Sequence, residues 1–400
     1  MKTLKLNDSA EDRLSNIPDS LVLHIFSFLN AKQVVQTCVL SKRWVNLWKY
    51  LPTLTLFSSD FDNFDNFITF VTNILRHCYR DPSTSLHTLD FRHNGGLVSH
   101  LDVGLDPDLF NSILDYAVSH NVKQLRMSVK CDIEVFPSCI ASYHGLTSLN
   151  FYVPPKNPRN PRCRRGKILF PDSLNMPSLT YLNIGFVAFH GGVDYFSTFP
   201  KLNRLLICHF DILGTQNLCI SSTTLDGLVI QKYSNPRVHC KIELSTPSLS
   251  TFVSIGTPFQ IVRRSHLGSL KHMEIYLDKI VNYAEAPSAL LNLFQELADI
   301  KSLALYSTSL HVLSLFPDVC KVKLNSLRKL KTLIIKEKGL SFTLSELLIN
   351  AKLAQNPAAR SQEEVAKLTE ELKEQSLSIP SEIIGFLLQN SPSAKFHIIN

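Results

Sequence analysis

The densest set of side chains that could do chemistry is a basic run at residues 156–167, KNPRNPRCRRGK, which holds six lysines and arginines and no acid. Charge at this density predicts a nuclear localisation signal or a contact with nucleic-acid phosphates. No aromatic residue lies within the run, so stacking on bases is not indicated. The alternative is a solvated loop insertion at 154–168 without a function of its own. The import residues would be Arg162, Arg164, Arg165 and Lys167.

Motifs for catalysis and metal binding are absent from the sequence. The patterns GxSxG, HExxH, GxxxxGKS, GxxxxGKT and GxGxxG do not occur. The acidic stretch DFDNFD at 60–65 resembles a calcium-binding loop. It lacks the turn glycine, however, and Phe64 occupies a ligand position, which favours the start of a helix. We therefore expect a non-catalytic protein without a metal or a cofactor.

The composition is that of a globular protein, with 44% hydrophobic and 19% charged residues in 400, so a sizeable core is expected. Without the basic run the formal net charge falls from +7 to +1, which argues against a basic fold. No stretch of about 18 apolar residues occurs, so no membrane span is expected. Nine cysteines without a CxxC pair, and an N-terminus without an apolar signal core, predict free thiols in a cytoplasmic and/or nuclear protein.

The elements that must position functional side chains are repeats of one pattern: apolar, two residues, apolar, one residue, apolar. Its last three positions alternate as in a strand, and one unit cannot bury its own apolar edge. Stacked units therefore predict a parallel sheet on the concave side of an arc. Start-to-start spacings of 21 to 36 residues include those of leucine-rich repeats. The predicted fold class is an α/β solenoid, with unrelated αβ units as the alternative. The copies are LHTLDF (86–91), VKQLRM (122–127), LTSLNF (146–151), LTYLNI (179–184), LNRLLI (202–207), LDGLVI (225–230), LSTFVS (249–254), LKHMEI (270–275), IKSLAL (300–305) and LKTLII (330–335).

Residues next to the buried positions of each strand would face the concave side. The early strands place polar residues there, whereas the middle strands bring apolar ones together, which predicts contact with a target protein. Two alternatives are that other segments cover these residues, or that the weak copy at 249–254 is misregistered by one position. The predicted target-binding residues are Leu206, Val229, Val253, Ile255, Tyr276 and Tyr306.

Helical periodicity marks both ends of the chain. Residues 11–52 carry three apolar stripes, which predict three short helices with apolar surface left for a partner, because so small a unit is not stable alone. The C-terminal residues would form a helical cap on the repeats. Helices are expected at 61–76, 287–298, 345–354, 361–375 and 381–392. The predicted domains are a flexible 1–10, a helical 11–52, a repeat array at 53–340 and a cap at 341–400.

Residues 14–48 resemble an F-box. The resemblance rests on Ile17-Pro18-Asp19, on Phe28-Leu29, and above all on Leu40-Ser41-Lys42-Arg43-Trp44 followed by Leu47-Trp48. With its repeats and its C-terminal FLLQNSPSAK (386–395), the chain resembles the plant F-box/leucine-rich-repeat family, of the FBD-like kind. One departure is Ile17, where the family more often has leucine, and this exchange is conservative.

The resemblance implies a function. F-box proteins are similar in acting as substrate-recognition subunits of SCF-type (cullin-RING) E3 ubiquitin ligases. The F-box binds a Skp-type linker, and through it the cullin and RING subunits, while the repeats bind a target protein for ubiquitination. Alternatives are a non-degradative binding scaffold and a nucleic-acid binder that uses the basic run at 156–167.

We expect the linker-binding residues to be apolar anchors of the F-box. For Trp44 and Trp48 the alternative is a place in the core of the F-box itself. The expected linker-binding set is Ile17, Pro18, Leu21, Ile25, Trp44 and Leu47.

Some related plant receptors hold an inositol phosphate on the concave face, and such a ligand needs a dense cluster of lysines and arginines. The basic residues predicted on this face are few and spread along the chain, so no such cofactor is expected. They are Arg92, Arg126, Arg204 and Lys336.

Overall fold

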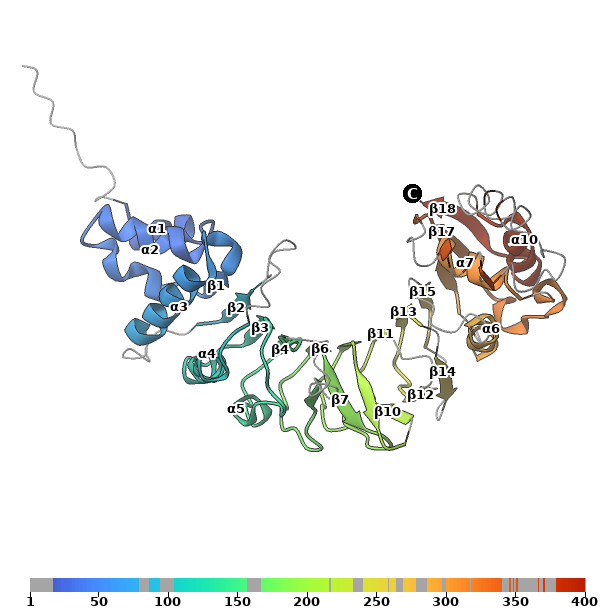
Figure 1. Ribbon diagram of the computed structural model, residues 1–400, viewed down its shortest axis with the longest axis horizontal. Coiled ribbons are helices and arrows are strands. Elements are labelled where there is room, and N and C mark those ends of the chain that lie inside the picture. The colour runs from blue at the N-terminus through green and yellow to red at the C-terminus, as the bar shows by residue number, and fades with distance from the viewer. Residues whose placement is uncertain are drawn as a thin grey trace, which may run out of the picture. The chain divides into compact units, whose positions relative to one another are not determined.

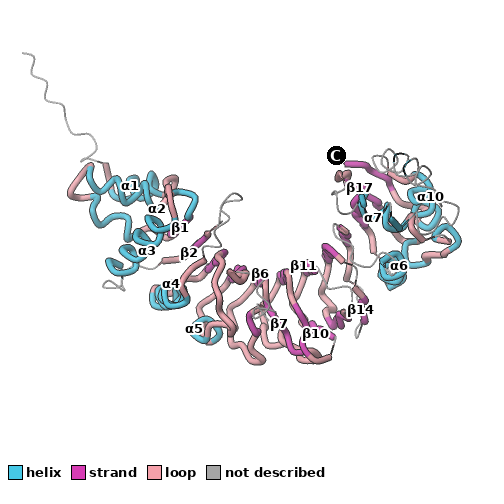
Figure 2. The backbone as a smooth tube through the Cα atoms, viewed as in Figure 1, coloured by secondary structure: helices cyan, strands magenta, loops and turns pink. Residues whose placement is uncertain are grey.

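The computed structural model describes residues 17–78, 86–93, 104–156, 167–215, 217–232, 240–257, 259–263, 269–277, 286–296, 300–316, 318–339 and 379–399, with isolated positions between 345 and 370. The chain divides into two compact units (Figure 1, Figure 2). Unit 1 spans Met1–Asp132 and Val153–Pro158, and unit 2 spans Ile133–Tyr152 and Arg159–Asn400.

Unit 1 starts with short helices. α2 begins at a capping box, in which Asn30 Oδ1 accepts from the Gln33 N–H at 2.8 Å and Gln33 Oε1 accepts from the Asn30 N–H at 3.1 Å. The third predicted helix is 3₁₀ rather than α, because its sequence is rich in aromatic and β-branched residues, which are weak α-helix formers. The elements are α1 (Asp19–Phe26), α2 (Ala31–Gln36), η1 (Thr37–Val39) and η2 (Trp44–Tyr50).

Parallel strands complete unit 1, in the order β1, β2, β3. Helices lie in the connections, as parallel pairing requires. α3 starts inside DFDNFD, which confirms the helix start predicted for this stretch, and α4 starts at the N-cap Asp106. The bounds are β1 (Thr53–Phe57), η3 (Ser58–Asp60), α3 (Phe64–Cys78), β2 (Thr88–Arg92), α4 (Pro107–Ser119) and β3 (Gln124–Ser128).

Unit 2 holds a larger parallel sheet, with nine strands among its described residues. All ten strand segments predicted from the repeats are strands, two of them in unit 1 and eight here. A parallel sheet with helices is compatible with the predicted α/β solenoid. In sheet order the strands are β4 (Ser148–Tyr152), β6 (Tyr181–Gly185), β8 (Arg204–Cys208), β11 (Gly227–Lys232), β13 (Thr251–Gly256), β15 (His272–Tyr276), β16 (Ser302–Tyr306), β17 (Thr332–Lys336) and β18 (Lys395–Ile399).

Side chains of these strands alternate between two faces. In β13, Phe252 and Ser254 are buried, whereas Val253 and Ile255 are half-buried. This excludes a one-position error in the register predicted for the weak copy at 249–254. We call the face opposite the buried side chains the open face of each sheet.

The buried face of the unit 2 sheet is backed by short helices and by two small parallel sheets that the repeat pattern does not predict. In Figure 1, β7 and β10 are drawn below β6 and β11. Two non-glycine residues with left-handed backbone mark the turns into these strands, namely Phe186 (φ 60°) after β6 and His209 (φ 50°) after β8. The small sheets are β5 (Ile168–Leu169), β7 (Val187–His190) and β9 (Asp211–Leu213), and β10 (Asn217–Ser221), β12 (Lys241–Ser245) and β14 (Gln260–Arg263); the helices are α5 (Ser138–Ala141), α6 (Ala286–Glu296) and α7 (Ser307–Leu313).

The C-terminal part differs from the predicted helical cap. Helix α10 (Ser381–Asn390) confirms the helix expected at 381–392, and α6 confirms the one at 287–298. However, the described sheet ends with strand β18, which pairs with β17, and not with a helix. The helices predicted at 345–354 and 361–375 lie largely outside the described residues.

Candidate functional site

The N-terminal helices of unit 1 share one small core. It consists of the buried side chains of Val22, Phe26, Val34, Trp44 and Leu47. The rings of Phe26 and Trp44 meet edge to face, with centroids 5.7 Å apart. Trp44 is 5% exposed and Leu47 8% exposed. Both side chains join the helices from inside, which favours the alternative of a place in the F-box core for Trp44 and gives Leu47 a core position as well.

An apolar stripe remains exposed on α1 and the turn after it. Leu21, Ile25 and Phe28 follow the spacing i, i+4, i+7, which places them on one side of the helix, and Phe28 is 76% exposed. Pro18 is exposed just before them, whereas Ile17 packs against the core. Phe28 is not among the predicted residues, although its spacing from Leu21 and Ile25 could have identified it.

A second exposed apolar group lies where η1 and η2 meet. It comprises Val39, Leu40 and Val45. Cys38 Sγ lies 3.6 Å from the carbonyl oxygen of Val45, which holds the two segments together. Large apolar side chains gathered on a surface make it a candidate for binding another molecule.

An ion pair fixes the start of α1. Arg43 Nε donates to Asp19 Oδ1 at 2.8 Å, so the segment before η2 is tied to the first turn of the helix. Trp48, next to the core, donates from Nε1 to the carbonyl oxygen of Val45 at 3.1 Å. These contacts orient the helices that carry the exposed stripe.

The second candidate surface is the open face of the unit 2 sheet. Strand pairing brings Leu206, Val229 and Val253 into one row across β8, β11 and β13. Ile255 occupies the next row, in register with Tyr276 of β15. The structure thus brings together the apolar residues predicted for target binding, as half-buried side chains on the open face.

Two tyrosines continue this surface. The rings of Tyr276 and Tyr306 lie with centroids 4.4 Å apart. Lys338 Nζ stands 4.3 Å from the centroid of Tyr276, and Lys336 Nζ stands 5.3 Å from that of Tyr306. Lys336 also donates to Glu274 Oε1 at 2.7 Å. The result is an aromatic pair whose faces are covered by lysines.

Burial and charge set the protonation of this region. Burial raises the pKa of Tyr306, and its hydrogen bond to Glu274 adds to this. Burial would lower the pKa of Lys336, but the hydrogen bond to Glu274, the charge of Glu274 and the contact with Tyr306 together outweigh it and raise the pKa above its ordinary value. Burial also lowers the pKa of His272, whose Nδ1 lies 3.0 Å from Ser302 Oγ.

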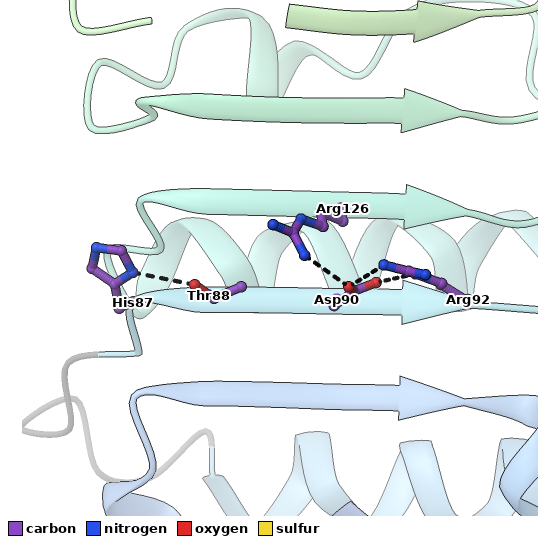
Figure 3. Close-up of polar contacts among 5 residues, drawn as sticks. All are labelled: His87, Thr88, Asp90, Arg92 and Arg126. Carbon is purple, nitrogen blue, oxygen red and sulfur yellow. Dashed lines mark hydrogen bonds and ion pairs between the residues drawn. The ribbon is translucent and has the colours of Figure 1, made fainter. Parts of the chain in front are cut away.

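The open face of unit 1 carries a compact charged cluster on β2 and β3 (Figure 3). Arg92 donates from Nε and Nη2 to the two carboxylate oxygens of Asp90, both at 2.7 Å. Arg126, from the neighbouring strand, approaches Asp90 Oδ2 with Nη1 at 3.4 Å. The hydrogen bond with Asp90 raises the pKa of Arg92, against the opposing effect of burial.

Only the two ends of the basic run at 156–167 are among the described residues. Arg162, Arg164 and Arg165 lie outside the described residues. Lys167 is bonded to Asp211 Oδ1 at 2.7 Å, and its pKa is lowered by burial. Lys167 is therefore an ion-paired, largely buried residue of unit 2, unlike the solvated position expected for it.

Two buried thiols lie in surroundings that disfavour the reactive thiolate form. Burial raises the pKa of Cys131 and of Cys208 to about 11, so both are protonated at neutral pH. Over the described ranges, no group of three or more His, Cys, Asp and Glu side chains could hold a metal ion. The described helices include none with the length and apolarity needed to cross a bilayer.

Comparison with known proteins identifies the class of the helical segment. The F-box domain family matches residues 14–55. An F-box/LRR-repeat protein of Arabidopsis thaliana is 54% identical to this chain over 50 residues, which is 12% of this chain and 10% of that protein. The chain therefore carries an F-box domain.

Longer matches extend through the repeats. A putative FBD-associated F-box protein of Arabidopsis thaliana is 28% identical over 240 residues, 57% of this chain and 47% of the relative. An FBD-associated F-box protein of the same plant is 28% identical over 308 residues, 74% of this chain and 67% of the relative. The chain spans about half the length of several such relatives. The resemblance to plant F-box/FBD/LRR-repeat proteins is confirmed, since these proteins are homologues of the chain over much of its length.

Proposed function

We propose that this chain is the substrate-recognition subunit of an SCF-type (cullin-RING) E3 ubiquitin ligase. The observation that carries the proposal is the exposed stripe of Leu21, Ile25 and Phe28 on an F-box whose own core is filled by other side chains. Burying each of these side chains against a partner contributes about 1.5–3 kcal/mol. The occupant is a Skp-type linker, the kind of protein that F-box domains generally bind, and through it the cullin and RING subunits.

The open face of the unit 2 sheet is proposed to bind the target protein. Its row of Leu206, Val229 and Val253 offers apolar contact, and the pair Tyr276 and Tyr306 offers the aromatic anchors that are enriched at protein interfaces. The chain would contribute no chemical step. It would raise the concentration of the target near the ubiquitin-carrying enzyme.

Linker binding can be tested with one double variant and one control. Leu21→Asp with Ile25→Asp places two carboxylates in the stripe, and co-purification with a Skp-type linker should be lost. Val135→Asp alters an exposed valine of unit 2, and co-purification should persist. Retention of the linker by the double variant would overturn the adaptor proposal.

Target binding is tested separately. The double variant Val229→Asp, Val253→Asp is used for affinity purification from plant cells in which the proteasome is inhibited. It should no longer capture target proteins, whereas it should still capture the linker. Leu213→Asp is the matched control, because this partly exposed leucine lies on β9 and not on the open face. Captured proteins that do not accumulate when the chain is removed would indicate a non-degradative scaffold instead.

A role of the basic run in nuclear import is part of the same proposal. Replacing Arg162, Arg164 and Arg165 by alanine in a fluorescent fusion should shift the protein from the nucleus to the cytoplasm. An unchanged distribution would leave the run as a charged loop insertion.

A further inference from the structure

The charged cluster on unit 1 contains one deeply buried carboxylate beneath two accessible guanidinium groups. The Asp90 side chain is 4% exposed, whereas those of Arg92 and Arg126 are each 45% exposed. Taking a carboxylate out of water costs several kcal/mol unless cations and hydrogen bonds compensate it. The two arginines provide that compensation, and Asp90 in return holds their positions.

Arg92 is held in a defined orientation. Two of its five N–H groups are used in the fork to Asp90. The Phe57 ring, on β1, lies under the guanidinium with its centroid 5.1 Å away. The remaining N–H groups of Arg92 have no hydrogen-bond partner among the described residues, so they are available to a ligand on the open face.

Arg126 stands beside this fork. It comes from β3, where it is in register with Asp90, and its one contact with Asp90 is long at 3.4 Å. Ser128 lies on the same strand as Arg126 and is in register with Arg92 of β2. Two arginines and one aspartate leave one net positive charge at this place.

The geometry points to an oxyanion-binding site on the open face of unit 1, formed by Arg92 and Arg126 and positioned by Asp90. Guanidinium forks match the spacing of two oxygens on one carboxylate or phosphoryl group. The ligand would be an acidic or phosphorylated side chain of the target protein. This deepens the proposed function, because it rests on the proposal that the chain binds a target protein, and it adds a contact on unit 1 to the one proposed on unit 2.

The test measures peptide binding directly by the full chain, and needs neither a linker nor ubiquitination. Two fluorescent peptides of otherwise equal sequence carry either glutamates or phosphoserines, and fluorescence anisotropy gives each affinity. Arg126→Ala should weaken binding by about tenfold or more, because a charge-assisted contact is lost, while Arg92 continues to bind Asp90. Arg328→Ala is the control, an exposed arginine in the connection before β17 and not on a strand, and should change the affinity by less than about twofold.

A second variant distinguishes specific binding by the two guanidinium groups from non-specific attraction of an acidic peptide to positive charge. Arg92→Lys with Arg126→Lys retains both charges opposite Asp90 but removes the planar forks. Binding weakened by about tenfold supports the site, and binding equal to that of the unchanged chain overturns it. Binding of only one peptide identifies the carboxylate or the phosphoryl group as the ligand, and binding of neither overturns the inference. Co-purification of the linker with the same variants reports independently on the adaptor proposal.

Discussion

The F-box segment and the open face of the unit 2 sheet expose apolar side chains in different ways. On the F-box, Phe28 projects into solvent, above a core that is complete without it. On the sheet, Val229 is half-buried between Leu206 and Val253 of the adjacent strands. The F-box surface can therefore gain much free energy by burial, whereas the sheet offers fixed rows of contacts that favour selectivity.

The difference also concerns charge. The exposed stripe of Leu21, Ile25 and Phe28 is apolar throughout. The unit 2 face instead combines its apolar row with Glu274 and Lys336, which are bonded to each other. Specific recognition needs such polar groups, because an ill-matched partner would leave them unpaired. The surface proposed to bind the linker and the surface proposed to bind a target thus differ in composition.

The largest expected effect comes from comparing two phenylalanines of the F-box. Phe26→Ala removes a fully buried ring and should lower the free energy of unfolding by about 3–5 kcal/mol. Phe28→Ala should change stability by less than about 0.5 kcal/mol, yet weaken linker binding by about tenfold or more, as expected for an interface anchor. Urea denaturation and a linker titration measure the two quantities. Equal stability losses in both variants would contradict the division into core and surface.

The same comparison applies to neighbouring residues of β11. Leu228 is buried, and Leu228→Ala should cost about 2–5 kcal/mol of unfolding free energy. Val229 lies on the open face, where part of its side chain is already in water. Val229→Ala should therefore lower the unfolding free energy by less than Leu228→Ala does. Urea denaturation of the two variants tests the ordering. A larger loss for Val229→Ala would show that the open face is part of the core.

The strands could be predicted from the sequence because each repeat carries its apolar residues at the spacing that a strand needs. Leu51, Leu54 and Leu56 carry the same pattern, so β1 could have been predicted as well. The small sheets could not, since the turn into β7 uses a left-handed Phe186, and phenylalanine gives no signal for that conformation.

The candidate sites were less predictable for a geometric reason. Periodicity shows which residues of a short helix share a face, but not whether that face meets its own core or solvent. Trp44 is therefore buried in the core, the alternative to linker binding, whereas Phe28, which was not among the predicted residues, is exposed. Likewise, an aspartate at an open-face position of a strand is expected to be exposed, and the burial of Asp90 depends on two arginines that approach it in space.

A smaller effect is expected from the ion pair on the unit 2 face. Lys336→Gln leaves the carboxylate of Glu274 without its 2.7 Å partner. The pair is partly exposed, so the loss in unfolding free energy should be about 1 kcal/mol, and it should shrink at high salt. Lys395→Gln, an exposed lysine of β18, is the matched control and should leave stability unchanged. Equal unfolding free energies for the two variants would mean that the ion pair of Lys336 and Glu274 does not stabilise the sheet.

The smallest effect concerns pH and His272. Its pKa in the folded chain is lowered by burial first and by Lys336 as well, although Glu274 opposes this. As the pH falls below about 6.5, the unfolded chain therefore binds the proton more readily than the folded chain does. The stability that neutral His272 provides is present above that pH and is lost as the pH falls through the lower pKa of the folded state. His272→Gln removes this titration, so urea denaturation at pH 7.5 and 5.5 should show a smaller loss of stability in the variant than in the unchanged chain. Parallel losses in both would mean that His272 is not held neutral by its place on the open face.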